Sequence, residues 1–270
     1  MNPILWLELR TRLRERKLWI LALLFLLLFA GIDFATIFGG SWQDPESRPP
    51  ADIGGVLHGA NTAALMGLAL VLGWAIGSGR LPQEREQRTL SGLLNTPLSG
   101  WEIVAGKLMG SWALLLWFFS LTLPFFAFSF LWGGRPWGNA LAGFGVCLLT
   151  GLTVTAISVG LSGFFRRTAT SYIAIGLLLL IWLLLLPILG GICQIPLQGK
   201  SHETARTVVE TLFFSHNPVV VLVSVMWEPD GDYTKSSLIF CEGLGVWIGL
   251  SALSLWIGVR GLRRGFAEKL

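Results

Sequence analysis

Charged residues are scarce in this chain. Asp, Glu, Lys and Arg together make up 13% of its 270 residues, and hydrophobic residues make up 53%, whereas a typical soluble domain carries about 25% charged residues. The mean hydropathy is +0.65. This composition excludes a soluble globular protein and indicates a polytopic membrane protein.

A phosphate-binding loop is absent from the sequence. That loop has the form G-x-x-x-x-G-K-[ST], in which backbone N–H groups cradle a phosphate and the lysine reaches it. Lys107 is followed by Leu108, and Lys200 has Gln194 where the first glycine is required. We therefore expect that this chain does not hydrolyse ATP by that route.

Side chains for catalysis or metal binding are also few. The chain has three cysteines and three histidines, and no spacing among them is typical of a metal site. The tetrapeptide at 160–163 matches the G-x-S-G form of an intramembrane serine protease, which needs a histidine base beside its serine. All three histidines map to the outer side of the predicted topology, and Ser162 maps to the inner side. We therefore predict no catalytic residue, no metal and no enzyme activity in this chain.

Two ionisable residues, Asp33 and Glu242, lie inside predicted spans. Such groups are functional candidates because they are costly at membrane depth. Both lie within about two helical turns of the outer interface, so no proton relay crosses the bilayer centre. Two interpretations stay open: an acid in an outer vestibule, and a substrate site in an ion-coupled secondary transporter.

Six apolar stretches are long enough to cross a bilayer. A hydrocarbon core about 30 Å thick needs about 20 apolar residues per helix. The sequence therefore predicts an all-α fold with six transmembrane helices in a single membrane domain over 1–270. The predicted spans are 18–38, 57–79, 106–132, 138–163, 170–193 and 238–260.

Lysine and arginine cluster in alternate loops of this topology. Fifteen of the 20 lie in 1–17, 80–107, 166–167 and 260–269. Since short cytoplasmic loops retain Lys and Arg, we predict that both termini are cytoplasmic and that the protein lies in the inner membrane of a bacterial-type cell. The same bias explains the pI of about 9.3, so we expect no nucleic-acid binding.

The stretch 207–226 is apolar enough to be mistaken for a seventh span. It contains Glu210, His216 and a helix-breaking Asn217-Pro218, and a seventh crossing would place the C-terminal arginines outside. We predict an external loop over 196–236 that holds this stretch as a re-entrant helix or as an amphipathic helix on the surface.

The N-terminal residues 1–17 place Leu5, Leu9 and Leu13 four residues apart among basic side chains. This spacing predicts an amphipathic elbow helix lying on the inner leaflet. A basic anchor that only orients the protein accounts for the charges equally well.

Between the second and third spans lies a polar segment that begins at Pro82, a residue suited to a first helical turn. Glu84 and Arg88 are spaced as an i,i+4 pair, so we predict a helix from about 83 to 95. Pro97 disfavours its continuation. Ser99 then begins an S-x-x-E sequence, the capping-box form that starts a new helix.

The same segment carries a resemblance to a known family. It resembles the permease of ABC-2 type (type 2 exporter) transporters, whose bacterial members share ERE-x-x-T-L-x-x-L-L-x-T-P-[LV]-S-x-x-E-I-x-x-G-K after the second span. Before the threonine the family often has glycine, where this chain has Arg88. The matching residues are Glu84, Arg85, Glu86, Thr89, Leu90, Leu93, Leu94, Thr96, Pro97, Leu98, Ser99, Glu102, Ile103, Gly106 and Lys107.

The resemblance implies a function. It implies an export permease that pairs with a second copy or a paralogue and is driven by separate ATP-binding cassette subunits, which bind the ATP and Mg²⁺, while this chain holds no cofactor. The segment 82–98 would be the coupling helix, set into a groove on the ATPase. The residues implied in coupling are Glu84, Arg85, Glu86, Arg88, Thr89, Leu90, Leu93, Leu94, Thr96, Pro97, Ser99 and Glu102, with a smaller contact from Arg166 and Arg167.

Two other functions stay open from the sequence. One is a non-transporting membrane scaffold or assembly protein, which would show no transport coupled to ATP turnover. The other is the ion-coupled secondary transporter, which would normally show more ionisable residues within its spans.

Overall fold

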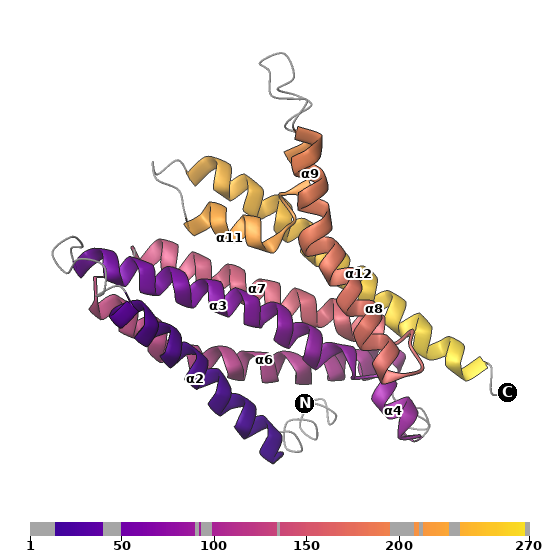
Figure 1. Cartoon of the computed structure of the whole chain (residues 1–270). Helices are drawn as coiled ribbons and strands as arrows, with labels where there is room; N and C mark the ends of the chain where they lie inside the picture. The colour runs from indigo at the N-terminus through magenta and orange to yellow at the C-terminus, as the bar shows by residue number, and fades with distance from the viewer. Residues whose placement is uncertain are drawn as a thin grey trace.

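The computed structural model describes residues 14–39, 50–89, 92, 99–133, 136–194, 208–210, 213–226 and 233–267. Over these ranges all regular secondary structure is helical, as the all-α prediction requires. In chain order (Figure 1) the helices are α2 (Arg16–Gly39), α3 (Pro50–Ser78), α4 (Pro82–Glu86), α6 (Gly100–Leu131), α7 (Trp137–Ser162), α8 (Thr168–Leu180), the π-helical η2 (Ile181–Leu185), α9 (Leu186–Gln194), α11 (Pro218–Met226) and α12 (Tyr233–Ala267).

Large apolar side chains point outward along these helices. Leu27, Ile173 and Ile248 are 59–64% exposed, and a surface of this kind is stable in lipid rather than in water. All six predicted spans are confirmed, and the chain is a multi-pass membrane protein. The helical stretches long and apolar enough to cross a membrane are Arg16–Gly39, Ile53–Glu86, Gly100–Leu131, Trp137–Ser162, Thr168–Gln194 and Phe240–Gly261.

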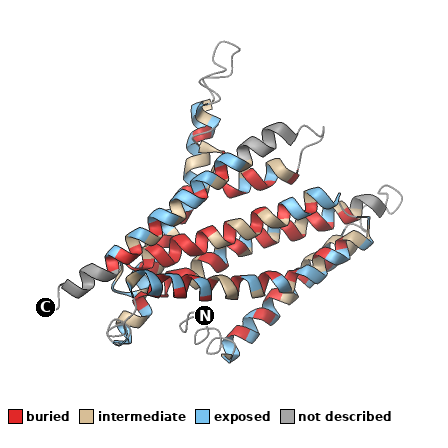
Figure 2. Ribbon diagram, turned by 180° about the vertical axis from the view of Figure 1, so that it is seen from behind, coloured by how far each residue is buried: buried red, intermediate tan, exposed pale blue. Residues whose placement is uncertain are grey.

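Helices α3 and α7 form the centre of the bundle. They lie side by side (Figure 1), and buried residues concentrate on them and on α6 (Figure 2). Gly77 of α3 allows the close approach, because a Cβ there would lie 2.5 Å from the Cβ of Ser158 and 2.9 Å from the carbonyl oxygen of Thr155. Together with Gly73, which meets α7 in the same way, it forms a small-residue packing site.

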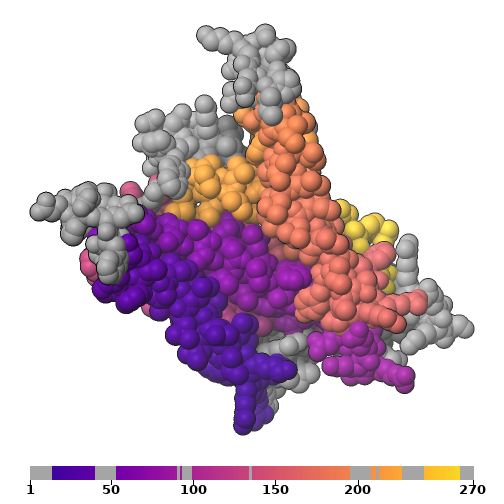
Figure 3. All heavy atoms as spheres, viewed as in Figure 1, coloured from indigo at the N-terminus to yellow at the C-terminus, as the bar shows by residue number. Residues whose placement is uncertain are grey.

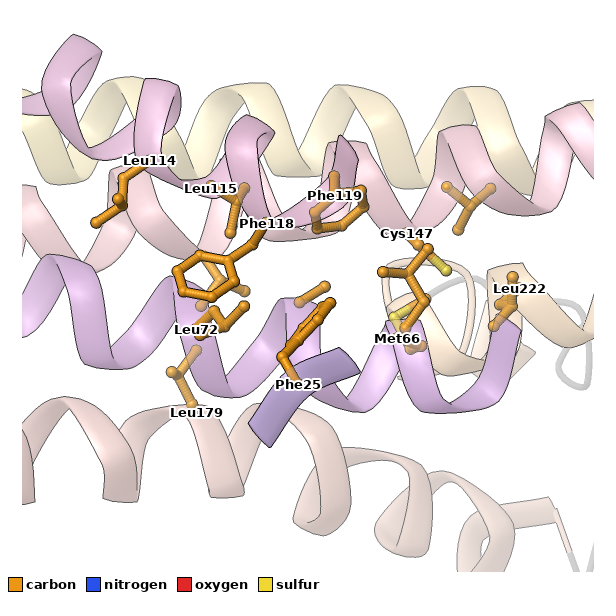
Figure 4. Packing of buried hydrophobic residues seen from close by; sticks show 14 of the residues in the cluster. Phe25, Met66, Leu72, Leu114, Leu115, Phe118, Phe119, Cys147, Leu179 and Leu222 are labelled. Carbon is orange, nitrogen blue, oxygen red and sulfur yellow. The ribbon is translucent and has the colours of Figure 1, made fainter. Parts of the chain in front are cut away.

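Aromatic and aliphatic side chains fill the space between α2, α3 and α6 (Figure 4). The ring centroids of Phe25 in α2 and Phe118 in α6 lie 5.4 Å apart. Leu72 of α3 and Leu115 of α6 belong to the same buried cluster. This packing holds the first span against the centre of the bundle.

Helix α12 crosses α7 at glycines. A Cβ added to Gly258 would lie 2.5 Å from the carbonyl oxygen of Gly160, and one added to Gly261 would lie 2.7 Å from the carbonyl oxygen of Gly163. The two backbones are therefore in direct contact. The other glycine pair of α12, at positions 245 and 249, has no atom within 4 Å of an added Cβ, so it packs against nothing in the described part of the chain.

The apolar stretch between the fifth and sixth spans contains the nine-residue helix α11, which is too short to cross a membrane. Its residues Val221 and Leu222 are buried in the main core. Asn217 begins the helix, because its Oδ1 accepts a hydrogen bond from the N–H of Val219 at 3.0 Å. As predicted, this stretch is not a seventh span, and its backbone is packed against protein.

Asn217 also joins α11 to the fifth span. Its Nδ2 donates a hydrogen bond of 3.0 Å to the carbonyl oxygen of Leu183. That carbonyl lies four residues before Pro187, which has no N–H to offer it, and the helix passes through the π-helical turn η2 just there. The side chain of Asn217 thus satisfies a backbone group at the break in the fifth span.

The two described ends of the chain lie toward the lower side of Figure 1, as does α4. An even number of spans places both ends of a chain on the same side of the bundle. Residues 1–13 of the predicted elbow helix lie outside the described residues, so the elbow stays a prediction, as does the cytoplasmic assignment drawn from the charges.

Candidate functional site

The polar segment after the second span begins with the short helix α4. This helix ends at Glu86, because Arg88 adopts the left-handed region with φ = 58°. The N–H of Thr89 donates to the carbonyl oxygen of Glu84 at 3.0 Å, and the N–H of Arg88 donates to that of Arg85 at 3.2 Å. These are the two hydrogen bonds of a Schellman motif, which closes a helix.

The predicted helix from 83 to 95 does not run unbroken, since α4 stops one turn after it starts and residues 87–89 are not helical. Within 90–95 the structure describes Gly92 alone, and that residue is helical. Glu84 and Arg88 are not an i,i+4 pair on one helix face. The physical reason is that neighbouring helices hold the side chains of α4, and these tertiary contacts override the local helix pattern. The left-handed position also explains why glycine, which pays no Cβ penalty there, suits residue 88.

Replacing Arg88 with glycine is expected to stabilise this helix end by about 1 kcal/mol, because a residue with a Cβ is strained at positive φ. Slower hydrogen exchange of the Thr89 amide would measure the gain. Arg88→Ala removes the same side chain but keeps the Cβ, so it should give no gain. Equal protection in both variants would contradict the strain.

Glu84 points from α4 toward the third span. Its Oε1 forms an ion pair with Nζ of Lys107 in α6. The Lys107 side chain is only 2% exposed and that of Glu84 is 20% exposed, so the pair is largely withdrawn from solvent. It ties α4 to the first turns of α6.

Arg85 points toward the C-terminal end of α7 and the part of α12 beside it. Its Nη2 donates to the carbonyl oxygens of Gly163 at 2.7 Å and Gly261 at 3.2 Å, and its Nη1 donates to that of Phe165 at 3.1 Å. The acceptors at 163 and 165 lie within three residues of the last residue of α7, where carbonyl groups lack partners within the helix. One guanidinium therefore binds both helices of the glycine crossing.

Glu86 points toward the fifth span. Its two carboxylate oxygens accept hydrogen bonds from the N–H of Thr168 at 2.8 Å and from its Oγ1 at 2.5 Å. Thr168 is the first residue of α8, and the preceding Arg167 caps it with no side-chain hydrogen bond. Glu86 thus caps α8 from a different element. On the face shown in Figure 3, α4 lies directly below the start of α8.

Helix geometry explains why three consecutive residues reach three different places. Successive residues of a helix point about 100° apart, so Glu84, Arg85 and Glu86 face α6, the α7–α12 crossing and α8 in turn. We name these three residues the ERE triplet. The structure brings all three into contacts within the chain.

The remaining predicted residues of the segment fall into two groups. Ser99 and Glu102 form the predicted capping box: the Ser99 N–H donates to the Glu102 carboxylate at 2.7 Å, and the Ser99 Oγ accepts from the Glu102 N–H at 3.3 Å. Thr89 takes part in the Schellman motif. The predicted residues outside the described part of the chain are Leu90, Leu93, Leu94, Thr96 and Pro97.

Beside the triplet lies an exposed basic surface. Arg166 and Arg167 sit in the turn between Phe165, which accepts from Arg85, and Thr168, which donates to Glu86. Both are exposed, as is Arg88 at the end of α4. We name Arg88, Arg166 and Arg167 the basic surface. It carries three positive charges at the end of the bundle where α4 lies.

The structure does not bring Asp33 and Glu242 together. Asp33 is buried on α2 and accepts a 2.9 Å hydrogen bond from Nδ2 of Asn61 in α3. Glu242 is exposed on α12, and α12 packs on α7, α6 and α11 rather than on α2. The two acids therefore belong to separate environments and do not form one vestibule site.

An apolar groove of about 570 Å³ lies between α7, the fifth span and α12. Trp182 and Leu186 line one wall and Leu250 and Leu253 the other, with His216 also in the lining. Burial lowers the pKa of His216, which favours the neutral imidazole at pH 7. The groove offers space for apolar groups and holds no cluster of charges.

Sequence reasoning missed the partners of the triplet. Lys107 was recognised as part of a motif but not as a buried counter-charge, and Thr168 was not singled out. The alternating charges of the triplet could have indicated these partners, because three adjacent side chains of alternating sign need three different groups to bind. The carbonyl groups of Gly163 and Gly261 could not be predicted as partners, because every residue has a backbone carbonyl and no side chain marks these two.

Comparison with known proteins extends these observations. A family model described as ABC-2 family transporter protein matches residues 2–257, which is nearly the whole chain. No curated protein matches the chain.

Proposed function

The chain belongs to the ABC-2 transporter family, and from this premise we propose that it is the membrane-spanning permease subunit of an exporter driven by a separate ATP-binding cassette subunit. The family membership supports a transport component of the membrane. The missing phosphate loop supports a partner that binds ATP and Mg²⁺. We further propose that the permease works with a second copy or a paralogue, as the family resemblance implies.

The observation that carries the docking proposal is the exposed position of the basic surface beside α4. Arg88, Arg166 and Arg167 are exposed to solvent and lie beside the ERE triplet. Arginine forks bind carboxylates in pairs of hydrogen bonds. We propose that these three residues contact an acidic groove on the ATPase, while the predicted apolar residues at 90, 93 and 94 supply the anchor.

Reversing all three charges tests this docking. Arg88→Glu, Arg166→Glu and Arg167→Glu together should weaken binding of the cassette ATPase that co-purifies with the tagged wild-type chain by at least about tenfold at low salt, because opposed surfaces become like-charged. The affinity of the wild type should fall as salt rises. Titration of the ATPase onto the purified permease in nanodiscs measures both.

A matched control is available at the start of the first span. Arg14, Arg16 and Lys17 are exposed, and the start of α2 lies at the same side of the bundle as α4 (Figure 1). Reversing these three charges changes the net charge, and the charge bias that orients the protein in the membrane, by the same amount. This control should leave ATPase binding unchanged. Failure of any cassette ATPase to co-purify with the wild type would reject the proposed function, and equal losses in both triple variants would reject the basic surface as the docking site.

A further inference from the structure

The ERE triplet binds four helices of its own chain, so a movement of α4 would be transmitted to these helices. We infer that the triplet is an intramolecular clamp, and that Arg85 is the positioning residue that makes α7 and α12 follow α4 when α4 is moved. The part of this inference that concerns the ATPase rests on the proposed function.

The charges of the triplet match the groups that they face. Glu84 meets the ammonium of Lys107. Arg85 meets carbonyl oxygens at the C-terminal end of α7, and Glu86 meets the N–H of the first residue of α8. Helix C-termini carry partial negative charge and N-termini partial positive charge, so each of the three contacts is attractive and a residue of the opposite sign would be repelled.

Arg85 forms hydrogen bonds with both helices at the crossing of α7 and α12. Its Nη2 is shared between Gly163 of α7 and Gly261 of α12, two residues whose backbones already touch. A guanidinium presents its donors in a rigid planar fork. A slide or separation of the two helices would therefore break at least one of these hydrogen bonds, so the clamp holds the crossing in one register.

The clamp also connects α7 and α12 to the other helices of the bundle. Helix α4 follows α3 in the chain after a short turn, and α3 packs along α7. Glu84 adds α6 and Glu86 adds α8 to the same helix. A force applied to the exposed end of α4 thus reaches five spans through covalent or hydrogen-bonded contacts, and the hydrogen bond from Arg85 to Gly261 connects α4 with α12.

The clamp is tested first without any partner. Arg85→Lys keeps the charge but removes the fork, and Arg85→Gln removes both. In the purified permease, hydrogen exchange of the backbone amides over 163–168 should become about tenfold faster in either variant, since charge-assisted hydrogen bonds are lost. The control Arg88→Lys should leave it unchanged. Unchanged exchange in both Arg85 variants would overturn the clamp, whatever the function of the protein.

The mechanical role is tested with the ATPase bound. In a chain whose three cysteines are replaced by alanine, spin labels are attached through Leu131→Cys and Ile248→Cys, two exposed positions on α6 and α12. In the labelled permease that keeps Arg85, the distance between the two spin labels should change when the ATPase binds ATP. Arg85→Lys should bind the ATPase within about twofold of wild type and lose that change.

The outcomes separate the two proposals. Absence of ATPase binding to the wild type defeats the proposed function, while the exchange measurement still decides the clamp. A tenfold loss of ATPase affinity in Arg85→Lys would instead make Arg85 a docking residue. Normal binding with a retained ATP-dependent distance change would show that Arg85 does not transmit the movement.

Discussion

Replacing Gly160 with leucine is expected to lower the free energy of unfolding by about 3 kcal/mol, since overpacking of a close helix contact cannot be relieved by a rotamer change. Even a Cβ at this position would lie 2.3 Å from the carbonyl carbon and oxygen of Ser254 and 2.7 Å from the backbone nitrogen of Leu255. These are backbone atoms of α12. The whole helix must therefore move outward to admit the side chain.

Unfolding in mixed detergent micelles, followed by tryptophan fluorescence, measures this loss. Gly249→Leu is the matched control, because it makes the same substitution on α12 at a position with nothing within 4 Å of an added Cβ. The control should change the stability by less than about 0.5 kcal/mol. Similar losses in the two variants would show that the crossing of α7 and α12 is not the cause.

The same substitution should disturb the contacts that Arg85 makes. Because Arg85 binds carbonyls of both α7 and α12, separation of the helices at Gly160 also stretches its hydrogen bonds. We expect faster hydrogen exchange over 163–168 in Gly160→Leu than in Gly249→Leu. The glycine crossing and the clamp are thus parts of one structure.

Replacing Lys107 with methionine is expected to cost about 3 kcal/mol, because it leaves the carboxylate of Glu84 without its counter-charge in a largely buried position. The Lys107 side chain is 2% exposed, and Oε2 of Glu84 is buried without a hydrogen-bond partner. Methionine has a similar length, so the loss reports on charge rather than on an empty cavity. The unfolding free energy in detergent measures it.

A double-mutant cycle isolates the pair. Glu84→Gln combined with Lys107→Met removes both charges, and this double variant should be more stable than Lys107→Met alone by about 1–3 kcal/mol. Lys17→Met, at an exposed lysine of α2, should leave the stability almost unchanged. A double variant that is less stable than either single variant would exclude the ion pair as a source of the effect.

Several features followed from the sequence because they depend on local chemistry. The spans could be predicted from hydropathy, since about 20 apolar residues are needed to cross lipid wherever they lie in the bundle. The capping box at Ser99 could be predicted because its partners are three residues apart. Gly73 and Gly77 were recognisable as small residues, but nothing in the spacing distinguished them from Gly245 and Gly249, which contact no other helix in the described chain.

The predicted helix 83–95 is interrupted after Glu86, and the cause is tertiary. Local signals favoured a helix with an internal ion pair, yet the charges of α4 pair with groups far away in the sequence: Lys107 is 23 residues from Glu84, and Gly261 is 176 residues from Arg85. Such partners depend on which helices are neighbours. No periodicity within the segment contains that information.

Hydropathy, charge bias and one polar motif were sufficient to establish a six-span membrane protein of the ABC-2 kind, because the bilayer imposes its length and charge rules on each span separately. The arrangement of the spans in the folded chain determined the partners of the ERE triplet. Close packing at glycines brought the C-terminal end of α7 against α12, and this proximity placed their carbonyls within reach of Arg85. The polar segment between the second and third spans is, in the folded chain, anchored through the charges of the ERE triplet, and the basic surface lies exposed beside it.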